Sequence, residues 1–453
     1  MSLLSISQLL EDSQLIGSFI MFKGWVKQIR FARAGKLLFL HLGDGTSIKT
    51  IQVVFEIPEN FDQEITFESS VEVHGQLITS PGRGQKVEIK ANLIILIGYC
   101  PADYPFQKSR QEYTSEYLRQ YPHLRPKTQK FSTVMRIRDT LSFVTQKFYR
   151  KNGFHWIHTP ILTTSDCEGA GETFKVSVEK EKEFFKDKQA YLTVSGQLHL
   201  EPFACSMGRV YTFGPSFRAE KSTTSRHLSE FWMLEPEMAF STLDEILSIS
   251  ENYIKTVFRQ CLKHHNDDLL FLESKTGKSL IKKIEQVIYE DFEIITYDQA
   301  IEILKKSGKE FEKPNEWGVD FGSDQERYIC EEVFNKPTYI THYPAQIKAF
   351  YMYVDNPEIE DENKKTVACA DLLFPGIGEV MGGSQREHRY EILKTKMEQL
   401  KLNYQWYLDT RKYGSVPHAG FGIGFDRLLR YITGIDHICD VVPYPVRFES
   451  ICS

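Results

Sequence analysis

The order of apolar and polar residues along the chain predicts a β-rich region followed by a mixed one. Over residues 18–100, short runs such as FIMFKGWVKQIR and SSVEVHGQLI alternate between apolar and polar side chains, and glycine-rich turns separate them. Strict alternation is typical of a strand with one buried face. Several closely spaced strands of this kind can close into a small barrel. The pattern therefore predicts a compact β-domain at the N-terminus.

A helical pattern begins near Ser132. Its apolar residues recur at spacings of four and three and form one stripe, made of Ile137, Leu141, Val144 and Phe148. Ser132 or Thr133 is expected to cap the start of this helix and Gly153 its end. A strand ending at Pro160 should follow. The stripe fits either a core helix or a helix that packs against a second copy of the chain.

The strongest local pattern further along predicts a hairpin of two buried strands. Its arms, residues 209–218 and 230–240, are rich in β-branched and aromatic residues, and a polar, cationic loop joins them. Arg218 and Glu220 lie two positions apart, so they should share one strand face. A fixed guanidinium is a good planar clamp for a phosphate, and Phe231 on the facing arm could stack on a base. Taken alone, the Arg-x-Glu pair would be an ordinary surface ion pair.

Residues 420–430, GFGIGFDRLLR, predict a strand that runs into a helix. Glycine at alternate positions leaves one strand face bare, while the large apolar residues between the glycines pack the other face. A bare face lets a flat ligand lie against the backbone. Asp426 and Arg427 fall in the first turn of the helix. Such a run usually marks close packing, but beside the Arg218 hairpin it favours a ligand site.

Length and composition place the chain in a broad class. The 453 residues are 41% hydrophobic and 26% charged, which is ordinary for a soluble globular protein of two or three domains. The net charge of −6 gives no general attraction to nucleic acid, so RNA binding would need local basic patches. No two of the eight cysteines form a Cys-x-x-Cys pair, and we expect all of them to be reduced thiols. Neither a signal peptide nor a membrane-spanning run is evident, so a cytoplasmic protein is expected.

The hairpin and the glycine-alternating strand resemble motifs 2 and 3 of the class II aminoacyl-tRNA synthetases. Motif 1, an interface helix followed by a strand ending in proline, is matched by KNGFHWIHTPIL at residues 151–162, with Pro160 at the expected place. The resemblance is closest to the aspartyl, asparaginyl and lysyl subgroup, and within it to the asparaginyl enzymes. It covers nearly the whole chain and rests on three motifs in the expected order.

The resemblance implies an α+β fold in three parts. Residues 1–100 would form a five-stranded OB-fold barrel that binds the anticodon, and residues 101–131 a hinge. Residues 132–453 would form the class II catalytic domain, an antiparallel sheet flanked by helices, with a helical elaboration around 242–340. A homodimer joined through residues 137–160, the motif 1 helix and strand, is also implied. The basic residues of the hinge suit either tRNA contact or a solvated linker, and they are Lys108, Arg110, Arg119, Arg125, Lys127 and Lys130.

For the barrel, the resemblance implies a tRNA anticodon site built on stacking as well as charge. An aromatic residue at the position of Phe39 stacks on the middle anticodon base in related enzymes, and Arg30 and Gln52 would supply donors. The apolar neighbours on either side of Phe39 leave open that it is a core residue instead. The family pattern usually has arginine where this chain has Gly43, which removes one expected contact.

The implied reaction joins an amino acid to AMP with release of pyrophosphate and then passes the acyl group to tRNA. It asks for positioning and charge neutralisation, with no obligatory side-chain nucleophile. Arg218 and Arg427 would be the catalytic cations. The resemblance places ATP against Arg218, Glu220, Arg226, His227, Phe231, Glu379, Gly424 and Arg427. Magnesium would be held by Asp371 and Glu379, two carboxylates across a Pro-Gly turn.

The amino-acid site is the basis for expecting asparagine. Glu168 and Gln197 match positions that hold the α-ammonium, and Arg386 matches the arginine that grips the side chain. Aspartyl enzymes have lysine where this chain has Leu200, and aspartate where it has Glu235. One cation and one carboxylate fit an amide, with Arg386 on the carbonyl oxygen and Glu235 on the NH₂, directly or through water. L-Asparagine and tRNA(Asn) are therefore the expected substrates.

Three alternatives stay open at this point. An aspartyl or relaxed-specificity enzyme would share most of these residues. A non-enzymatic, synthetase-like RNA-binding protein would be expected to have lost the phosphate-binding residues, yet Arg218, Arg427, Asp371 and Glu379 are all present. An ATP-dependent asparagine synthetase built on the same catalytic fold would not need the N-terminal barrel.

Overall fold

The computed structural model describes residues 4–82, 84–107, 113–164, 172–179, 184–186 and 188–451. The chain divides into two compact units, Met1–Arg136 and Ile137–Ser453. The division falls within helix α3 (Gln129–Lys151). In the described ranges no helix combines the length and the apolar character needed to cross a membrane.

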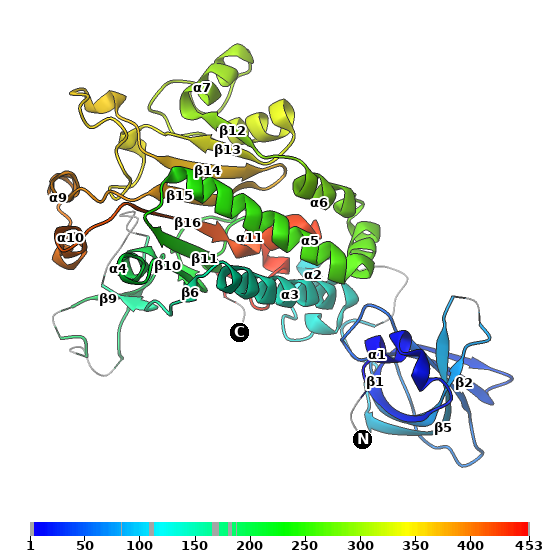
Figure 1. Cartoon of the computed structure of the whole chain (residues 1–453). Coiled ribbons are helices and arrows are strands. Elements are labelled where there is room, and N and C mark those ends of the chain that lie inside the picture. The colour runs from blue at the N-terminus through cyan, green and yellow to red at the C-terminus, as the bar shows by residue number, and fades with distance from the viewer. Residues whose placement is uncertain are drawn as a thin grey trace. The chain divides into compact units, whose positions relative to one another are not determined.

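The first unit contains the predicted five-stranded closed barrel (Figure 1). Its strands, in the order β1-β2-β3-β5-β4, are β1 (Phe19–Ala32), β2 (Leu37–Gly43), β3 (Ile51–Glu56), β4 (Ser70–Thr79) and β5 (Val87–Gly98). Helix α1 (Ile6–Glu11) adds Ile6 and Leu9 to the barrel core, and a 3₁₀ turn η1 (Ser13–Leu15) follows it. Every second residue of β2, including Leu38, Leu40 and Leu42, is buried in that core. The alternating pattern thus predicted the barrel correctly.

The segment after the barrel is more compact than a proline-rich hinge would suggest. It contains α2 (Ser115–Arg119) and the 3₁₀ turn η2 (Arg125–Lys127). The Phe106 ring packs against four tyrosine rings, those of Tyr104, Tyr113, Tyr117 and Tyr121. Arg125 is 1% exposed, and its guanidinium lies 4.1 Å from the centroid of the Phe131 ring. Arg125 is therefore buried away from a tRNA contact, and Lys108 and Arg110 lie outside the described residues.

The second unit is built on an eight-stranded sheet (Figure 1). In spatial order its strands are β12 (Glu293–Thr296), β13 (Thr338–Thr341), β14 (Cys369–Phe374), β15 (Gly378–Gln385), β16 (His418–Gly424), β11 (Glu230–Ala239), β10 (Arg209–Phe217) and β6 (His155–Trp156). Pairing is antiparallel from β13 to β10 and parallel at both ends, in β12–β13 and β10–β6. This is the α+β catalytic fold that was expected.

Helices and short elements complete this unit. Its other helices are α4 (Gln197–Met207), α5 (Leu243–Thr276), α6 (Leu280–Tyr289), α7 (Tyr297–Lys306), α8 (Ser323–Arg327), α9 (Tyr390–Gln399), α10 (Gln405–Lys412) and α11 (Phe425–Thr433). A small sheet is formed by β7 (Leu162–Thr163), β9 (Ala190–Leu192) and β8 (Lys175–Val176), and a second one by β17 (Val446–Arg447) and β18 (Ser450–Ile451). The remaining turns are the π-helix η3 (Tyr328–Phe334) and the 3₁₀ turns η4 (Ala345–Ile347), η5 (Glu362–Lys364) and η6 (Ile438–Asp440).

The elaboration around residues 242–340 does more than cover the sheet. The long helix α5 packs across β14, β15 and β16, while β12 and β13 extend the sheet itself. α5 breaks at His265, whose backbone is non-helical with φ −127° and ψ 29°. The His265 ring lies 2.7 Å from Asp268 Oδ2 and 2.7 Å from Thr140 Oγ1. The kink in α5 therefore contacts α3 through Thr140.

The motif 1 helix differs from its prediction at its start. α3 begins at Gln129, so Ser132 and Thr133 lie inside the helix and do not cap it. Gly153, with φ +79°, follows its end as expected. The predicted strand is the two-residue β6, and it ends before Pro160, which has no N–H to give to a ladder.

The apolar stripe of α3 faces the interior of its own unit. Its four residues are at most 7% exposed, and the Phe148 ring lies 5.4 Å from the Tyr253 ring of α5. The apolar side chains that motif 1 leaves exposed are different ones, Phe143 at 66%, Trp156 at 43% and Leu162 at 49%.

Candidate active site

A first cavity lies between the β10–β11 hairpin and the β16–α11 junction. The antiparallel pairing of β10, β11 and β16 brings residues 218–233 beside residues 422–427. All eight residues expected around ATP line this first cavity: Arg218, Glu220, Arg226, His227, Phe231, Glu379, Gly424 and Arg427. The fold therefore gathers residues spread over more than two hundred positions of the sequence into one site.

Arg218 and Glu220 follow the end of β10 and do not lie on the strand. The Arg218 guanidinium lies 5.3 Å from the centroid of the Phe231 ring and 3.9 Å from a Glu220 carboxylate oxygen. Arg427 Nη1 donates a hydrogen bond of 2.8 Å to the backbone oxygen of Glu379. A cation, an aromatic face and a carboxylate acceptor are the groups that a nucleotide requires.

The electrostatics of the first cavity favour an anion. Burial, and after it the charges of Arg427, Arg226 and Arg218, together lower the pKa of His227 to about 4. The His227 Nδ1 atom lies 3.0 Å from Ser222 Oγ. Three arginines beside a neutral imidazole suit the oxygens of a polyphosphate, and the carboxylates of Glu220, Glu379 and Asp426 share the same lining.

A second cavity adjoins the first. It is lined by Gln197, Glu235 and Arg386, three of the four residues expected around the amino acid. The fourth, Glu168, lies outside the described residues. Arg218, Met233, Glu379 and Gly422 line both cavities. The two spaces therefore meet at Arg218, the predicted α-phosphate ligand, and at Glu379, the predicted metal ligand.

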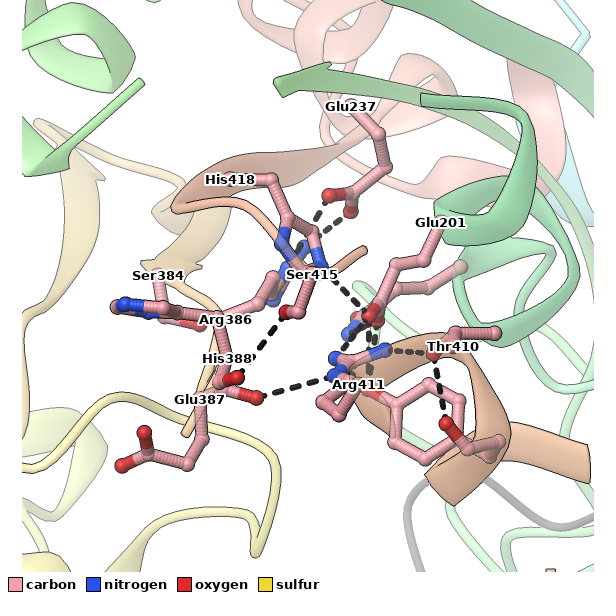
Figure 2. Close-up of polar contacts among 12 residues, drawn as sticks. Glu201, Glu237, Ser384, Arg386, Glu387, His388, Thr410, Arg411, Ser415 and His418 are labelled. Atoms are coloured by element: carbon pink, nitrogen blue, oxygen red, sulfur yellow. Dashed lines mark hydrogen bonds and ion pairs between the residues drawn. The ribbon is translucent and has the colours of Figure 1, made fainter. Parts of the chain in front are cut away.

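Arg386 is held rigidly beside the second cavity. Its Nη2 and Nε atoms donate to the two Glu237 oxygens at 2.5 and 3.3 Å, and its Nη1 donates to Ser384 Oγ at 2.9 Å (Figure 2). A Cβ at Gly420 would lie 2.2 Å from the Glu237 carboxyl, so glycine is required there. The sequence pattern was not used to predict a role for Glu237. Glu237 lies two positions from Glu235 on β11, so the two side chains share one strand face, and that spacing could have indicated its position.

Glu235 is also buried, but it has different partners. Its carboxylate accepts from the Ser195 hydroxyl and, at 3.0 Å, from the Gly196 backbone N–H. Burial raises the pKa of Glu235. Leu200 packs in a buried cluster with Ala204 and Val210 and does not line the cavity. In this chain, position 200 therefore does not face the substrate space.

Asp371 and Glu379 converge on the same spot. A Cβ at Gly382 would lie 3.2 Å from Glu379 Oε1 and 3.5 Å from Asp371 Oδ1. Burial raises the pKa of Asp371, although Lys348 Nζ donates to its Oδ2 at 2.5 Å and opposes that rise. Two hard oxygens in a polar cleft fit magnesium that shares the rest of its shell with phosphate and water. No group of three or more His, Cys, Asp or Glu is arranged to hold a metal in the part of the chain that the structure describes.

The sequence predicted no site in residues 242–340, but this segment contains a buried glutamate, Glu326 on α8, near the predicted magnesium ligands. Burial, and after it the charges of Glu379 and Asp371, together raise the pKa of Glu326 to about 7. A Cβ at Gly378 would lie 3.1 Å from Arg226 Nη1 and 3.6 Å from Glu326 Oε2. Nothing in the local sequence of α8 indicated this position, because it depends on how the elaboration packs on β15.

The three residues expected to read the anticodon lie on the barrel. Phe39 alternates with the core residues of β2 and is half-buried, so it does not belong to the barrel core. The guanidinium of Arg30, its partner in the β1–β2 ladder, lies 4.6 Å from the centroid of the Phe39 ring. Gln52 Nε2 donates to Glu88 Oε2 at 2.9 Å. A Cβ at Gly43 would lie 3.2 Å from the Lys27 side chain.

Comparisons with known proteins agree with this geometry. Residues 114–447 match the family described as tRNA synthetases class II (D, K and N), and residues 20–97 match an OB-fold nucleic acid binding domain. The chain is 44% identical to the asparagine–tRNA ligase of Shewanella oneidensis, over 98% of each chain. The chain belongs to the asparaginyl-tRNA synthetase family of class II. A similar ligase of Microcystis aeruginosa is 46% identical over 93% of this chain and 94% of its own.

Solved structures of this synthetase family have the same architecture. The asparaginyl-tRNA synthetase from Pyrococcus horikoshii complexed with asparaginyl-adenylate is 32% identical, with a TM-score of 0.88 over 100% of both chains. The enzyme from Entamoeba histolytica is 30% identical, with a TM-score of 0.84 over 97% of this chain and 98% of its own.

Proposed function

We propose that this chain is an asparagine–tRNA ligase. It activates L-asparagine with ATP to asparaginyl-adenylate and pyrophosphate, and then transfers the asparaginyl group to tRNA(Asn). The observation that carries the proposal is the junction of two cavities at Arg218. One cavity has the residues for a nucleotide, the other has those for an amino acid, and the reaction joins these two ligands. Family membership supports the same activity.

In the first step, an oxygen of the amino-acid carboxylate forms a bond to the α-phosphorus in line, and the bond to pyrophosphate breaks. Arg218, at the junction, neutralises charge on the α-phosphate as that charge redistributes. Arg427 and His227 contact the outer phosphates. Phe231 stacks on the adenine, and Glu220 accepts from its amino group. Magnesium held by Asp371 and Glu379 would neutralise phosphate charge.

Selection of asparagine rests on fixed groups of opposite sign. Arg386, locked by Glu237, donates to the side-chain carbonyl oxygen. Each oxygen of Glu235 already accepts one hydrogen bond and has a lone pair left for the substrate NH₂. An aspartate side chain would bring a second negative charge against Glu235, and the described residues that line this cavity supply no cation besides Arg218 and Arg386.

The remaining parts of the proposal concern the tRNA and a second subunit. The Arg30–Phe39 pair on the outer face of the barrel supports anticodon stacking, with Gln52 beside it. The exposed apolar side chains of motif 1, Phe143 and Trp156, support a homodimer.

The test is pyrophosphate exchange with asparagine and aspartate in parallel, followed by charging of tRNA transcripts with Asn and Asp anticodons. Exchange that depends on asparagine, with charging of tRNA(Asn), is expected. Exchange of equal efficiency with aspartate would favour a relaxed-specificity enzyme. Exchange with neither amino acid in a folded protein would overturn the proposal.

A further inference from the structure

A buried carboxylate stands directly behind the residue expected to receive the substrate ammonium. Gln197 and Glu201 are four residues apart on α4, so their side chains share one helix face. Gln197 Nε2 donates a hydrogen bond of 3.1 Å to Glu201 Oε1. Gln197 lines the second cavity, whereas Glu201 does not and is 0% exposed.

Glu201 faces three further side chains from two elements, Tyr407 and Arg411 of α10 and His418 of β16. Tyr407 Oη lies 2.9 and 2.8 Å from its two oxygens, Arg411 Nη2 donates to Oε2, and His418 Nε2 lies 3.0 Å from Oε2 (Figure 2). Burial would raise the pKa of Glu201, but Arg411 and His418 outweigh it and hold that pKa far below its ordinary value. The carboxylate is therefore ionised at every working pH.

An ionised carboxylate accepts hydrogen bonds and has none to give. The Gln197 amide can therefore meet Glu201 only through its NH₂ group. Since the amide is planar, its oxygen is turned to the other side. A flipped amide would place its oxygen against the Glu201 carboxylate and exchange a hydrogen bond for repulsion between two acceptors, which is costly in a buried site.

His418 fixes the other side of the carboxylate. Its Nδ1 atom lies 2.8 Å from the Val416 backbone oxygen, and its Nε2 atom faces Glu201. Both ring nitrogens thus face acceptor oxygens. The His418 backbone oxygen also accepts from the N–H of Arg386 at 2.8 Å. The support for Gln197 is therefore connected to the strand beside Arg386.

We propose that Glu201 is a positioning residue for amino-acid binding: it fixes the Gln197 amide so that its oxygen, and not its NH₂, faces the substrate α-ammonium. This inference rests on the proposed function, in which Gln197 contacts that ammonium. Arg411 and His418 keep Glu201 charged. An amide alone could not guarantee its own orientation, because its oxygen and nitrogen are nearly equal in size.

The first test is Glu201→Gln, which replaces a pure acceptor by a group that can donate or accept. Both orientations of Gln197 then find a partner. We expect KM for asparagine in pyrophosphate exchange to rise about tenfold, while KM for ATP changes less than about twofold. Glu201→Asp keeps the charge that Arg411 and His418 need but withdraws the oxygen from Gln197. Glu201→Asp should therefore also raise the KM for asparagine. It replaces Glu201→Gln as the test variant if Glu201→Gln does not fold.

Two comparisons separate positioning from general support of the fold. Tyr407→Phe removes another hydrogen bond to Glu201 and leaves Gln197 untouched, so it should lower Tm with little effect on the asparagine KM. In a Gln197→Ala background, Glu201→Gln should add no further rise in that KM, because the residue through which it acts is gone.

The inference is overturned if the Glu201 variants raise the KM for asparagine and ATP alike. It is equally overturned if Glu201→Gln has its full effect in the Gln197→Ala background. Failure of the proposed function looks different, since the wild-type protein itself would then show no asparagine-dependent exchange.

Discussion

Arg386 pairs with Glu237 and not with Glu235. The Arg386 Nη2 atom lies 2.5 Å from Glu237 Oε1, and both side chains are at most 3% exposed. Glu235, two positions earlier on β11, instead accepts from Ser195 and Gly196. The two glutamates therefore have separate tasks. Glu237 neutralises and orients the Arg386 guanidinium, and Glu235 keeps acceptor lone pairs directed into the cavity.

The first prediction concerns that fixed cation. Arg386→Lys keeps the charge but loses the two-pronged contact with Glu237 and the bond to Ser384. We expect kcat/KM for asparagine to fall by about two orders of magnitude, since a lysine cannot replace a bidentate guanidinium. The ATP KM should stay near its wild-type value. Pyrophosphate exchange at varied asparagine and ATP measures both.

A matched control is Arg389→Lys. Arg389 is also paired with a carboxylate, that of Glu387 at 2.8 Å, but it lines neither cavity. An equal loss in the two variants would show that the effect is general and unrelated to the substrate.

The second prediction is the selection of the amide. Glu235→Gln removes the acceptor for the substrate NH₂, which should cost about 1–3 kcal/mol of asparagine activation. It also removes the negative charge that opposes aspartate, so the ratio of kcat/KM for asparagine to that for aspartate should fall. Exchange with the two amino acids measures the ratio. An unchanged ratio in a folded, ATP-binding variant would place the discrimination elsewhere.

A companion change that the sequence suggested, Leu200→Lys, does not suit this chain. Position 200 is 0% exposed among Ala204, Val210 and Ile157. A lysine there would bury an ammonium group without a partner, at a cost of several kcal/mol. Glu235→Gln alone is therefore the cleaner test.

Local sequence patterns were enough to predict the parts of the site that lie on one element. The hairpin arms appear as β10 and β11, and the glycine-alternating run appears as β16 followed by α11. The residues that support the site from behind could not be found in this way. His418 reaches Glu201 across 217 positions of sequence. Glu326 comes close to Gly378 only because α8 packs against β15.

The first residue of helix α3 also could not be predicted from local sequence. Ser132 and Thr133 are good capping residues, yet the helix continues through them to Gln129. Thr133 is fully buried and accepts from Arg136 at 2.8 Å. Tertiary packing thus overrides the local signal, as is common at helix ends.

The third prediction concerns the anticodon. Phe39→Ala should weaken charging of tRNA by about 1–3 kcal/mol, the range for a base stacked on an aromatic ring. Pyrophosphate exchange without tRNA should be nearly unchanged, because the adenylate site lies in the other unit. Leu40→Ala, the neighbouring core position, is the control and should lower stability instead. Equal loss of both activities in the Phe39 variant would argue against stacking.

The fourth prediction concerns the second subunit. Phe143 is 66% exposed on α3, so a charge there is tolerated in a monomer but not in an apolar interface. Phe143→Asp should shift sedimentation from dimer to monomer at micromolar concentration. Tyr289→Asp, at an 80% exposed position on α6, is the control and should leave the sedimentation unchanged. A wild-type chain that is fully active as a monomer would contradict the proposal.

The last prediction follows from His227. Burial and the surrounding arginines lower its pKa to about 4, so the ring is neutral at pH 6 in the free protein. A bound triphosphate offsets the arginine charges and raises that pKa, so the ring should take up part of a proton when ATP binds. Calorimetry of ATP binding at pH 6, in two buffers with different ionisation enthalpies, measures the uptake. It should fade as the pH rises to 8 and be absent in His227→Asn. Uptake that persists in this variant would assign the proton to another group, with Glu326, whose pKa is about 7, as the first to examine.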